Sequence, residues 1–325
     1  MLGLFSAGRS GSTWLGCLLD SHPDVTYRFE PHAQVAGLFK DAKYANALLA
    51  SDRLSDSDLV SIRRGLLHSN PFIDKPPFFH KRSGALRLPG LRQALCVTAR
   101  KIPLARPLYR WLYTPTASTV LVFKHVAQED ACRRLINQTS MSLVYLARHP
   151  CGTVASLLRG QERGVMPSAR RGVVEQLLLD HAPALHARYA ERLPSLSVAQ
   201  IEALIWLCSV EWAFGRQRRP RAGVRLLFYE NLCRDTETEL EPLLEMMGLD
   251  LHSAVRAFIK ASKSGERSHL SELGIQKYFS VFRDPETSAN RWKSTLSVDD
   301  QRAIIDMVRD SHIFRWGVEE AGWEY

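Results

Sequence analysis

The chain opens with the stretch that decides its fold: Leu2-Gly3-Leu4-Phe5-Ser6-Ala7-Gly8-Arg9-Ser10-Gly11-Ser12-Thr13-Trp14-Leu15. Its apolar run passes into glycine and serine and then into helix-forming residues, which predicts a strand, an anion-binding loop and a helix. Gly8 and Gly11 permit backbone angles that turn the N–H groups of the loop onto an anion, and the helix directs its positive dipole end to the same point. Arg9 adds a cation, and Ser12 and Thr13 add hydroxyl donors. An ordinary Gly/Ser turn between a strand and a helix is the alternative interpretation of this stretch alone.

The composition is typical of a soluble globular protein, with 45% hydrophobic and 24% charged residues. We expect a single domain over residues 1–325, without a membrane span, because no apolar segment approaches the roughly 20 residues that cross a bilayer. The first expected strand begins the chain, which predicts a cytoplasmic protein, or a luminal one if a leader has been removed. Six cysteines lie far apart without a C-x-x-C pair, so we expect buried thiols and no metal site.

Positive charge is concentrated in one segment. The chain carries a formal charge of +9, and residues 75–110 hold nine Lys or Arg without one Asp or Glu. Three interpretations remain open: a solvated basic face, contact with an anionic acceptor, or peripheral contact with a membrane surface. Nucleic acid is not expected, because no recognised binding module accompanies the charge. Its prolines indicate that residues 71–117 form an irregular or partly helical insertion.

Short apolar runs alternate with helical patterns along the rest of the chain. After the first run, strands are expected at 25–29, 119–123, 142–146 and 224–228. This alternation predicts an α/β fold: a P-loop-like parallel sheet of about five strands with helices on both faces. Ligands of such sheets gather beyond the carboxyl ends of the strands. The residues that follow the strand ends are Arg9, Glu30, Lys124, His125, Arg148, Tyr229 and Glu230.

These segments resemble those of sulfotransferases that use 3′-phosphoadenosine 5′-phosphosulfate (PAPS). The loop of residues 8–14 is similar to the 5′-phosphosulfate loop of that family. Arg148, with Ser156 eight residues later, resembles the pair that binds the 3′-phosphate, and Tyr229 resembles a tyrosine that contacts adenine. Arg291-Trp292-Lys293 resembles a late basic motif that closes over the cofactor. Each of the four segments occurs in the order found in the family.

The resemblance implies a function. It implies in-line transfer of the sulfuryl group of PAPS to a hydroxyl or amine acceptor, without a metal and with release of adenosine 3′,5′-bisphosphate (PAP). The implied cofactor-binding residues are Gly8, Arg9, Ser10, Gly11, Ser12, Thr13, Trp14, Arg148, Ser156, Tyr229, Arg291, Trp292 and Lys293. The structural alternatives are a helix-capping or surface ion-pair role for Arg148 and a role as a small helix-packing residue for Ser156.

The catalytic group that takes the proton of the acceptor is expected among the strand ends. Glu30 is the first candidate, because a glutamate after the second strand is the base in the carbohydrate-type and tyrosylprotein-type members, which this chain resembles more than the cytosolic small-molecule members. His125 is the second candidate, and Arg9 and Lys124 are expected beside them as catalytic cations. A structural ion pair of Glu30 with Arg9 or Arg28, and a core position for His125, are the alternatives.

We expect a small-molecule or glycan acceptor, and the resemblance of the residues around Glu30 to carbohydrate-type members favours a sugar. Two other functions remain open. A P-loop nucleotide kinase or hydrolase is disfavoured because the loop lacks the lysine of G-x-x-x-x-G-K-[ST]. A non-catalytic anion-binding or glycan-binding protein on the same fold would bind PAPS without sulfating any acceptor.

Overall fold

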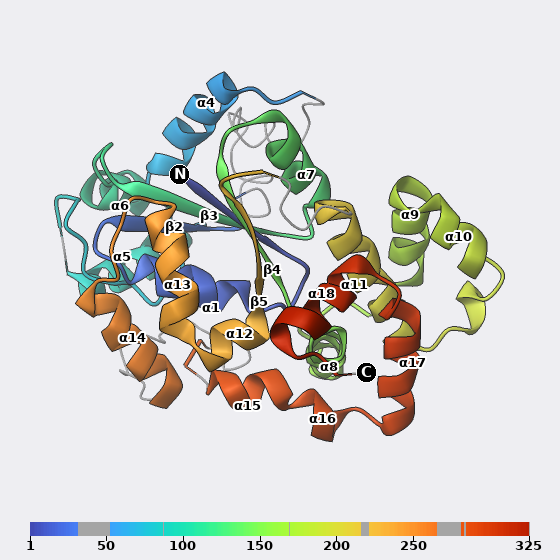
Figure 1. Ribbon diagram of the computed structural model, residues 1–325. Helices are drawn as coiled ribbons and strands as arrows, with labels where there is room; N and C mark the ends of the chain where they lie inside the picture. The colour runs from blue at the N-terminus through green and yellow to red at the C-terminus, as the bar shows by residue number, and fades with distance from the viewer. Residues whose placement is uncertain are drawn as a thin grey trace.

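Five parallel strands form one sheet in the computed structural model, which describes residues 1–31, 53–86, 88–168, 170–215, 221–264, 281–282 and 284–324 (Figure 1). The strands are β1 (Leu2–Ser6), β2 (Val25–Phe29), β3 (Val120–Val126), β4 (Ser142–Ala147) and β5 (Val224–Phe228). Their order in the sheet is β2-β3-β1-β4-β5, with every pairing parallel. The predicted α/β fold with about five parallel strands is confirmed.

The central strand β1 fixes the position of the loop that follows it. Ser6, the last residue of β1, pairs with Val126 of β3 and with Leu146 of β4. The chain builds β2 and β3 on one side of β1 and β4 and β5 on the other, so the loop after β1 lies where the strand order reverses. Such a reversal opens a crevice at the carboxyl edge of a doubly wound sheet.

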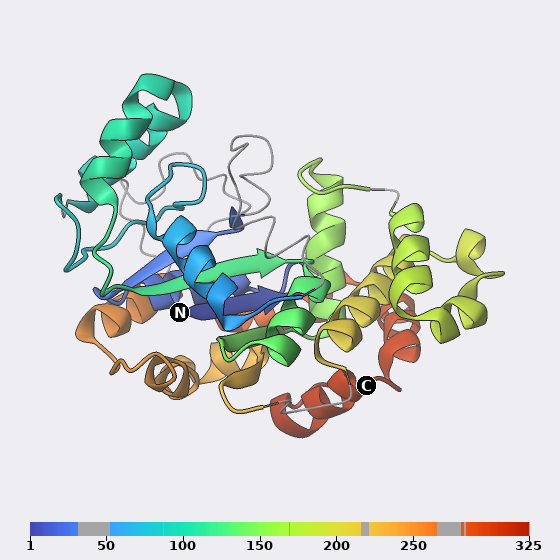
Figure 2. The same cartoon turned by 90° about the horizontal axis from the view of Figure 1, so that it is seen from above.

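Helices cover both faces of the sheet (Figures 1 and 2). The apolar side chains of one face pack with α1, α12, α13 and α14, and those of the other face pack with α4, α7, α11, α17 and α18. The helices of the first half are α1 (Ser12–Asp20), α4 (Asp56–Leu67), α5 (Pro89–Lys101), α6 (Arg106–Tyr113), α7 (Glu129–Gln138) and α8 (Pro150–Glu162). Those of the second half are α9 (Arg171–His181), α10 (Pro183–Tyr189), α11 (Val198–Phe214), α12 (Tyr229–Arg234), α13 (Thr236–Glu245), α14 (Ser253–Ser264), α15 (Pro285–Asn290), α16 (Trp292–Thr295), α17 (Val298–Val308) and α18 (His312–Ala321). Two 3₁₀ turns, η1 (Pro103–Ala105) and η2 (Leu193–Ser195), connect helices.

The strand β3 is longer than the sequence predicts. We expected it to end at Phe123, with Lys124 and His125 beyond it, but it continues to Val126 because its last residues pair with the end of β1. Lys124 and His125 are therefore neighbouring strand residues. Successive side chains of a strand point to opposite faces of the sheet, so these two cannot reach the same site.

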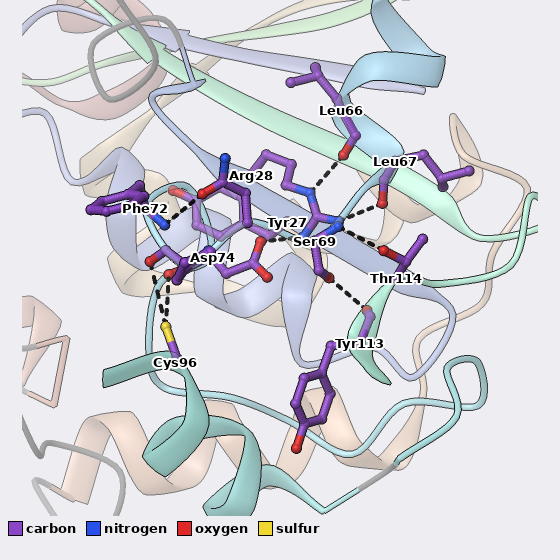
Figure 3. Close-up of polar contacts among 12 residues, drawn as sticks. Tyr27, Arg28, Leu66, Leu67, Ser69, Phe72, Asp74, Cys96, Tyr113 and Thr114 are labelled. Atoms are coloured by element: carbon purple, nitrogen blue, oxygen red, sulfur yellow. Dashed lines mark hydrogen bonds and ion pairs between the residues drawn. The ribbon is translucent and has the colours of Figure 1, made fainter. Parts of the chain in front are cut away.

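The basic segment is attached to the sheet through a buried ion network. Arg28 of β2 pairs with Asp74 at 2.5 Å and donates to the backbone carbonyls of Leu66 and Leu67, as Figure 3 shows. Arg92 of α5 and the hydroxyl of Tyr109 on α6 also contact the Asp74 carboxylate, at 3.0 and 2.8 Å. One carboxylate thus joins the sheet edge, α5 and α6.

Two further features bear on expectations from the sequence. All six cysteines are buried free thiols, as expected. Within the described ranges, no helix combines the length and the apolar character needed to cross a bilayer.

Candidate active site

The loop between β1 and α1 uses two left-handed residues. Gly11 has φ of 90° and Arg9 has φ of 68°, whereas Gly8, which we expected to need such freedom, does not have a positive φ. A side chain at Gly11 would also overlap the ring of Tyr229, which lies 2.3 Å from the position of a Cβ atom there. α1 begins without a side-chain cap and without an acidic residue in its first turn. Its N–H groups therefore face the loop without a competing carboxylate, a favourable arrangement for an anion.

Gly11→Ala should reduce the free energy of unfolding by about 1–3 kcal/mol. Alanine is strained at a left-handed φ, and its Cβ atom would displace the ring of Tyr229. Gly8→Ala is the matched control, because a Cβ atom there would meet only Val126, at 3.9 Å. Its effect should stay within about 0.5 kcal/mol. Urea unfolding of both variants measures the difference. Equal losses would show that Tyr229 and the left-handed angle do not restrict position 11.

A cavity of about 730 Å³ lies beyond the carboxyl ends of the strands. The predicted site residues that line it are Gly8, Arg9, Gly11, Ser12, Thr13, Trp14, Glu30, Lys124, Arg148, Ser156, Tyr229 and Arg291. Seven cationic side chains and two carboxylates of the described residues line it in total. An excess of cations in a concave site favours a polyanionic ligand.

Glu30 and Lys124 form an ion pair at one end of the cavity. The Lys124 ammonium lies 2.7 Å from Glu30 Oε1 and 3.1 Å from the Thr13 hydroxyl, so it connects β2, β3 and the start of α1. Lys124 is 2% exposed, and burial lowers its pKa, while the Glu30 carboxylate acts in the opposite direction. Glu30 has the left-handed φ of 43° and keeps 23% of its side chain exposed. Its backbone N–H donates to the carbonyl of Lys124. This carboxylate is held in place and still open to a ligand.

Arg148 is held at the opposite side of the loop. Its Nη atoms donate to the backbone carbonyls of Arg9 and Ser288, at 3.1 and 2.6 Å, and its guanidinium lies over the ring of Tyr229. Arg9 Nε donates to the hydroxyl of Ser156 on α8, at 3.2 Å. The loop and the two residues expected at the 3′-phosphate are therefore in direct contact. The ring of Trp14 meets that of Tyr229 edge to face at 6.3 Å.

Two predicted site residues, His125 and Ser10, do not line the cavity. His125 is fully buried, and its ring packs against Phe5 and Phe123 at 5.5 and 5.3 Å between centroids. It occupies the sheet face opposite Lys124, which corrects the expectation that both reach the site. Ser10 is also buried, and its hydroxyl donates to the carbonyl of Ala7. Its side chain shapes the loop from within.

The late basic motif contributes one residue to the cavity instead of three. Arg291 lines the cavity, but Trp292 stacks on His149 at 4.4 Å, and Lys293 pairs with Glu324 at 2.8 Å. Burial lowers the pKa of His149 to about 3, so its ring is neutral where it supports Trp292. Helix geometry explains the difference, because adjacent residues at the junction of α15 and α16 point in different directions.

Several cavity residues were not predicted as site residues. Lys75 lies at the Glu30 end, with its ammonium 3.7 Å from the centre of the Phe29 ring, while Lys124 approaches the same ring at 4.2 Å. Burial, and then the neighbouring Lys124, lower the pKa of Lys75 to about 8. Arg159, Arg170 and Glu202 line the cavity between α8 and α11, where Arg170 pairs with Glu202 at 2.8 Å. The acid-free basic run was the only sequence signal for Lys75, and no signal marked the other three.

The curated relatives that match the chain include two proteins named carbohydrate sulfotransferase 1. The chain is 25% identical over 332 aligned positions to carbohydrate sulfotransferase 1 of Mus musculus, covering 91% of this chain and 74% of the relative. The Rattus norvegicus protein of the same name matches with the same identity and coverage. No protein-family model matches the chain.

Solved structures are more distant. The sulfotransferase domain of the Synechococcus PCC 7002 olefin synthase is 17% identical, with a TM-score of 0.48 over 95% of this chain and 93% of that domain. A mouse sulfotransferase complexed with PAP is 13% identical, with a TM-score of 0.49 over 98% of this chain and 88% of the other.

The curated relatives match nearly the whole chain, and the loop after β1 shares one cavity with Glu30, Arg148 and Ser156. These findings support a PAPS-dependent sulfotransferase, an enzyme that transfers the sulfuryl group of PAPS to an acceptor.

Proposed function

We propose that the acceptor is a hydroxyl group of a carbohydrate and that Glu30 removes its proton. The curated relatives, which are named carbohydrate sulfotransferases, support the class of acceptor. The observation that carries the proposal is the position of Glu30, a partly exposed carboxylate that shares one cavity with the anion-binding loop and Arg148. A general base must lie within hydrogen-bond reach of the proton that it accepts, and Glu30 is open to the cavity where that hydroxyl would enter.

The residues present fit a nucleotide with two separate anionic groups. Arg148 is 8% exposed, and its Nε has no hydrogen-bond partner among the described residues, although burying an unpaired donor is costly. We assign Arg148 and Ser156 to the 3′-phosphate. The loop of residues 8–13 receives the 5′-phosphosulfate, and Trp14 and Tyr229 offer ring faces to adenine. Arg291 adds a cation at the edge of the cavity.

The chemistry then follows from charge and position. PAPS supplies the sulfuryl group. Glu30 accepts the proton of the acceptor hydroxyl, and Lys124 orients its carboxylate through the 2.7 Å contact. Arg9, Ser12 and Thr13 stabilise the negative charge that grows on the leaving phosphate. Lys75 adds a second ammonium at the acceptor end. The proposed mechanism assigns no role to four predicted site residues that lie outside the cavity: His125, Ser10, Trp292 and Lys293.

Arg148→Ala should weaken binding of PAP by about 10- to 150-fold, because hydrogen bonds to charged groups contribute roughly 1.5–3 kcal/mol. Binding of AMP, which lacks a 3′-phosphate, should be weak in the unmodified protein and change little in the variant. Isothermal titration calorimetry with both nucleotides measures this difference. Arg171→Ala is the control, because Arg171 also donates to backbone carbonyls but lies on α9 outside the cavity. Equal affinity of the unmodified protein for PAP and AMP would contradict the proposed 3′-phosphate site.

Incubation with radiolabelled PAPS and a panel of glycans, phenols, lipids and peptides tests the acceptor class. Label transferred only to glycans supports the proposal, and label transferred only to another class contradicts it.

The kinase, hydrolase and non-catalytic alternatives are not favoured, because the curated relatives are sulfotransferases. We also propose one domain over residues 1–325, with 71–117 as an insertion. The cytoplasmic location expected from the sequence has no support from the relatives and is not part of this proposal.

A further inference from the structure

Exposed apolar side chains are concentrated on α5, η1 and α6. Among the described residues, eleven large hydrophobic side chains are exposed, and six of them lie within residues 88–111: Leu88, Leu91, Ile102, Leu104, Leu108 and Trp111. Leu104 is 91% exposed and Trp111 is 70% exposed. A cluster of exposed apolar groups marks an interaction surface, whereas isolated ones are ordinary.

The exposed apolar face is distinct from the face that packs inside the protein. Tyr109 and Tyr113 of α6 are buried against Cys96 and Ala99 of α5. Leu108 and Trp111 of α6 are three residues apart, so they share a second face of that helix, which is directed to solvent, and Leu104 of η1 is exposed just before the helix begins. Figure 2 shows the α5–α6 pair standing out from the body at one end of the molecule. The exposed apolar side chains therefore belong to a pair of helices that stands out from the body of the protein.

All charges that the segment of residues 75–128 itself carries are positive. Lys101 and Arg110 are exposed beside the apolar residues, and no Asp or Glu occurs in the sequence between Asp74 and Glu129. Other cations of the basic segment are used inside the protein: Lys81 binds Asp20 and Arg92 binds Asp74. The exposed positive charge is therefore small in number but placed next to the exposed leucines and tryptophan.

We propose that the α5–α6 tip, defined as Lys101, Ile102, Leu104, Leu108, Arg110 and Trp111, docks the protein on an anionic lipid surface. Leucine and tryptophan insert at the boundary of head groups and acyl chains, and lysine and arginine remain with anionic head groups. Tryptophan is enriched at that depth because its ring is amphipathic. A second copy of the chain is disfavoured as the occupant, because a two-fold contact through this face would place Lys101 and Arg110 of both copies in one interface, to which residues 75–128 contribute no carboxylate.

The base of the protrusion is rigid enough to present such a face. Asp74 joins α5 and α6 to Arg28 of β2, and Arg100 donates to the backbone carbonyls of Pro71 and Asp74. Docking by a preorganised face loses less conformational entropy than docking by a loop that must fold on binding. This inference does not depend on the identity of the acceptor or of the catalytic base.

Cosedimentation of the full chain with phosphatidylcholine vesicles, with and without phosphatidylserine, tests the proposal. We expect binding to the phosphatidylserine vesicles that falls with added salt. Leu104→Ser combined with Trp111→Ser should lower the bound fraction to that of vesicle-free controls. Lys101→Gln combined with Arg110→Gln should weaken binding to the anionic vesicles by about thirtyfold. Val198→Ser combined with Val298→Ser is the matched control, because these side chains are also exposed, at 52% and 60%, but lie on other helices, and it should bind as the unmodified protein does.

Three results would overturn the proposal: no binding to either vesicle, equal loss of binding in the control pair, or a dimer that light scattering shows to depend on Leu104 and Trp111. Circular dichroism of each variant confirms that the substitutions, all at exposed positions, leave the fold intact. Sulfation of a soluble acceptor by the tip variants should remain at the level of the unmodified protein. That measurement separates the docking surface from the active site.

Discussion

Glu30→Gln is expected to lower turnover by a factor of about 10²–10⁴ while the affinity for PAP stays near that of the unmodified protein. Glutamine keeps the shape of the side chain and accepts a hydrogen bond from Lys124, which lies 2.7 Å from the carboxylate. It cannot take a proton from the acceptor. Because the proposed nucleotide contacts come from the loop, Arg148 and Ser156, the change should affect the chemical step and leave nucleotide binding intact. Steady-state rates with PAPS and calorimetry with PAP measure the two effects separately.

The second carboxylate of the cavity provides the matched control. Glu202 is 1% exposed and paired with Arg170, so it can act on the cavity only through its charge. Glu202→Gln should retain most of the turnover if Glu30 is the base. Similar losses in both variants would indicate a general electrostatic effect. Retention of more than a tenth of the turnover by Glu30→Gln would contradict its assignment.

The sequence predicts the ends of the strands other than β3 to within one residue, because their apolar runs have recognisable boundaries. The parallel sheet and the convergence of Arg9, Glu30, Lys124 and Arg148 follow from that pattern and from the geometry of parallel strands. The position of His125 could not be predicted in the same way. The sequence gives no signal that β3 continues through Lys124 and His125, because the continuation depends on pairing with β1, a partner more than 100 residues away.

Lys75 illustrates a second limit of the sequence pattern. In the sequence it is one of nine cations without a nearby acid, and nothing separates it from Lys101, which is exposed at the α5–α6 tip. Its neighbour Asp74 places it in the cavity, because that carboxylate is held by Arg28 of β2. From the sequence, Arg28 was one possible ion-pair partner of Glu30. In the structure Arg28 pairs with Asp74, and Glu30 pairs with Lys124.

Asp74→Ala is expected to reduce the free energy of unfolding by about 3–5 kcal/mol, because it would leave the cations of Arg28 and Arg92 buried without their carboxylate. Arg28 and Asp74 are completely buried as a pair, at 2.5 Å. Burial raises the pKa of Tyr109 well above its ordinary value, so its hydroxyl stays protonated and serves as the third donor to Asp74. Urea unfolding followed by circular dichroism measures the loss.

The exposed pair of Asp24 and Arg82 supplies the comparison that gives the Asp74 result its meaning. These side chains form an equally short contact, but they are 30% and 62% exposed, so water solvates the arginine when its partner is removed. Asp24→Ala should therefore cost no more than about 1 kcal/mol. A large difference between the two variants would show that the loss of stability comes from cations left buried without a partner. The loss of an ion pair alone would not explain it. If Asp74→Ala cost as little as Asp24→Ala, the segment that carries Lys75 and the α5–α6 tip would have to be held by its apolar contacts, among them the packing of Cys96 and Ala99 against Tyr109 and Tyr113.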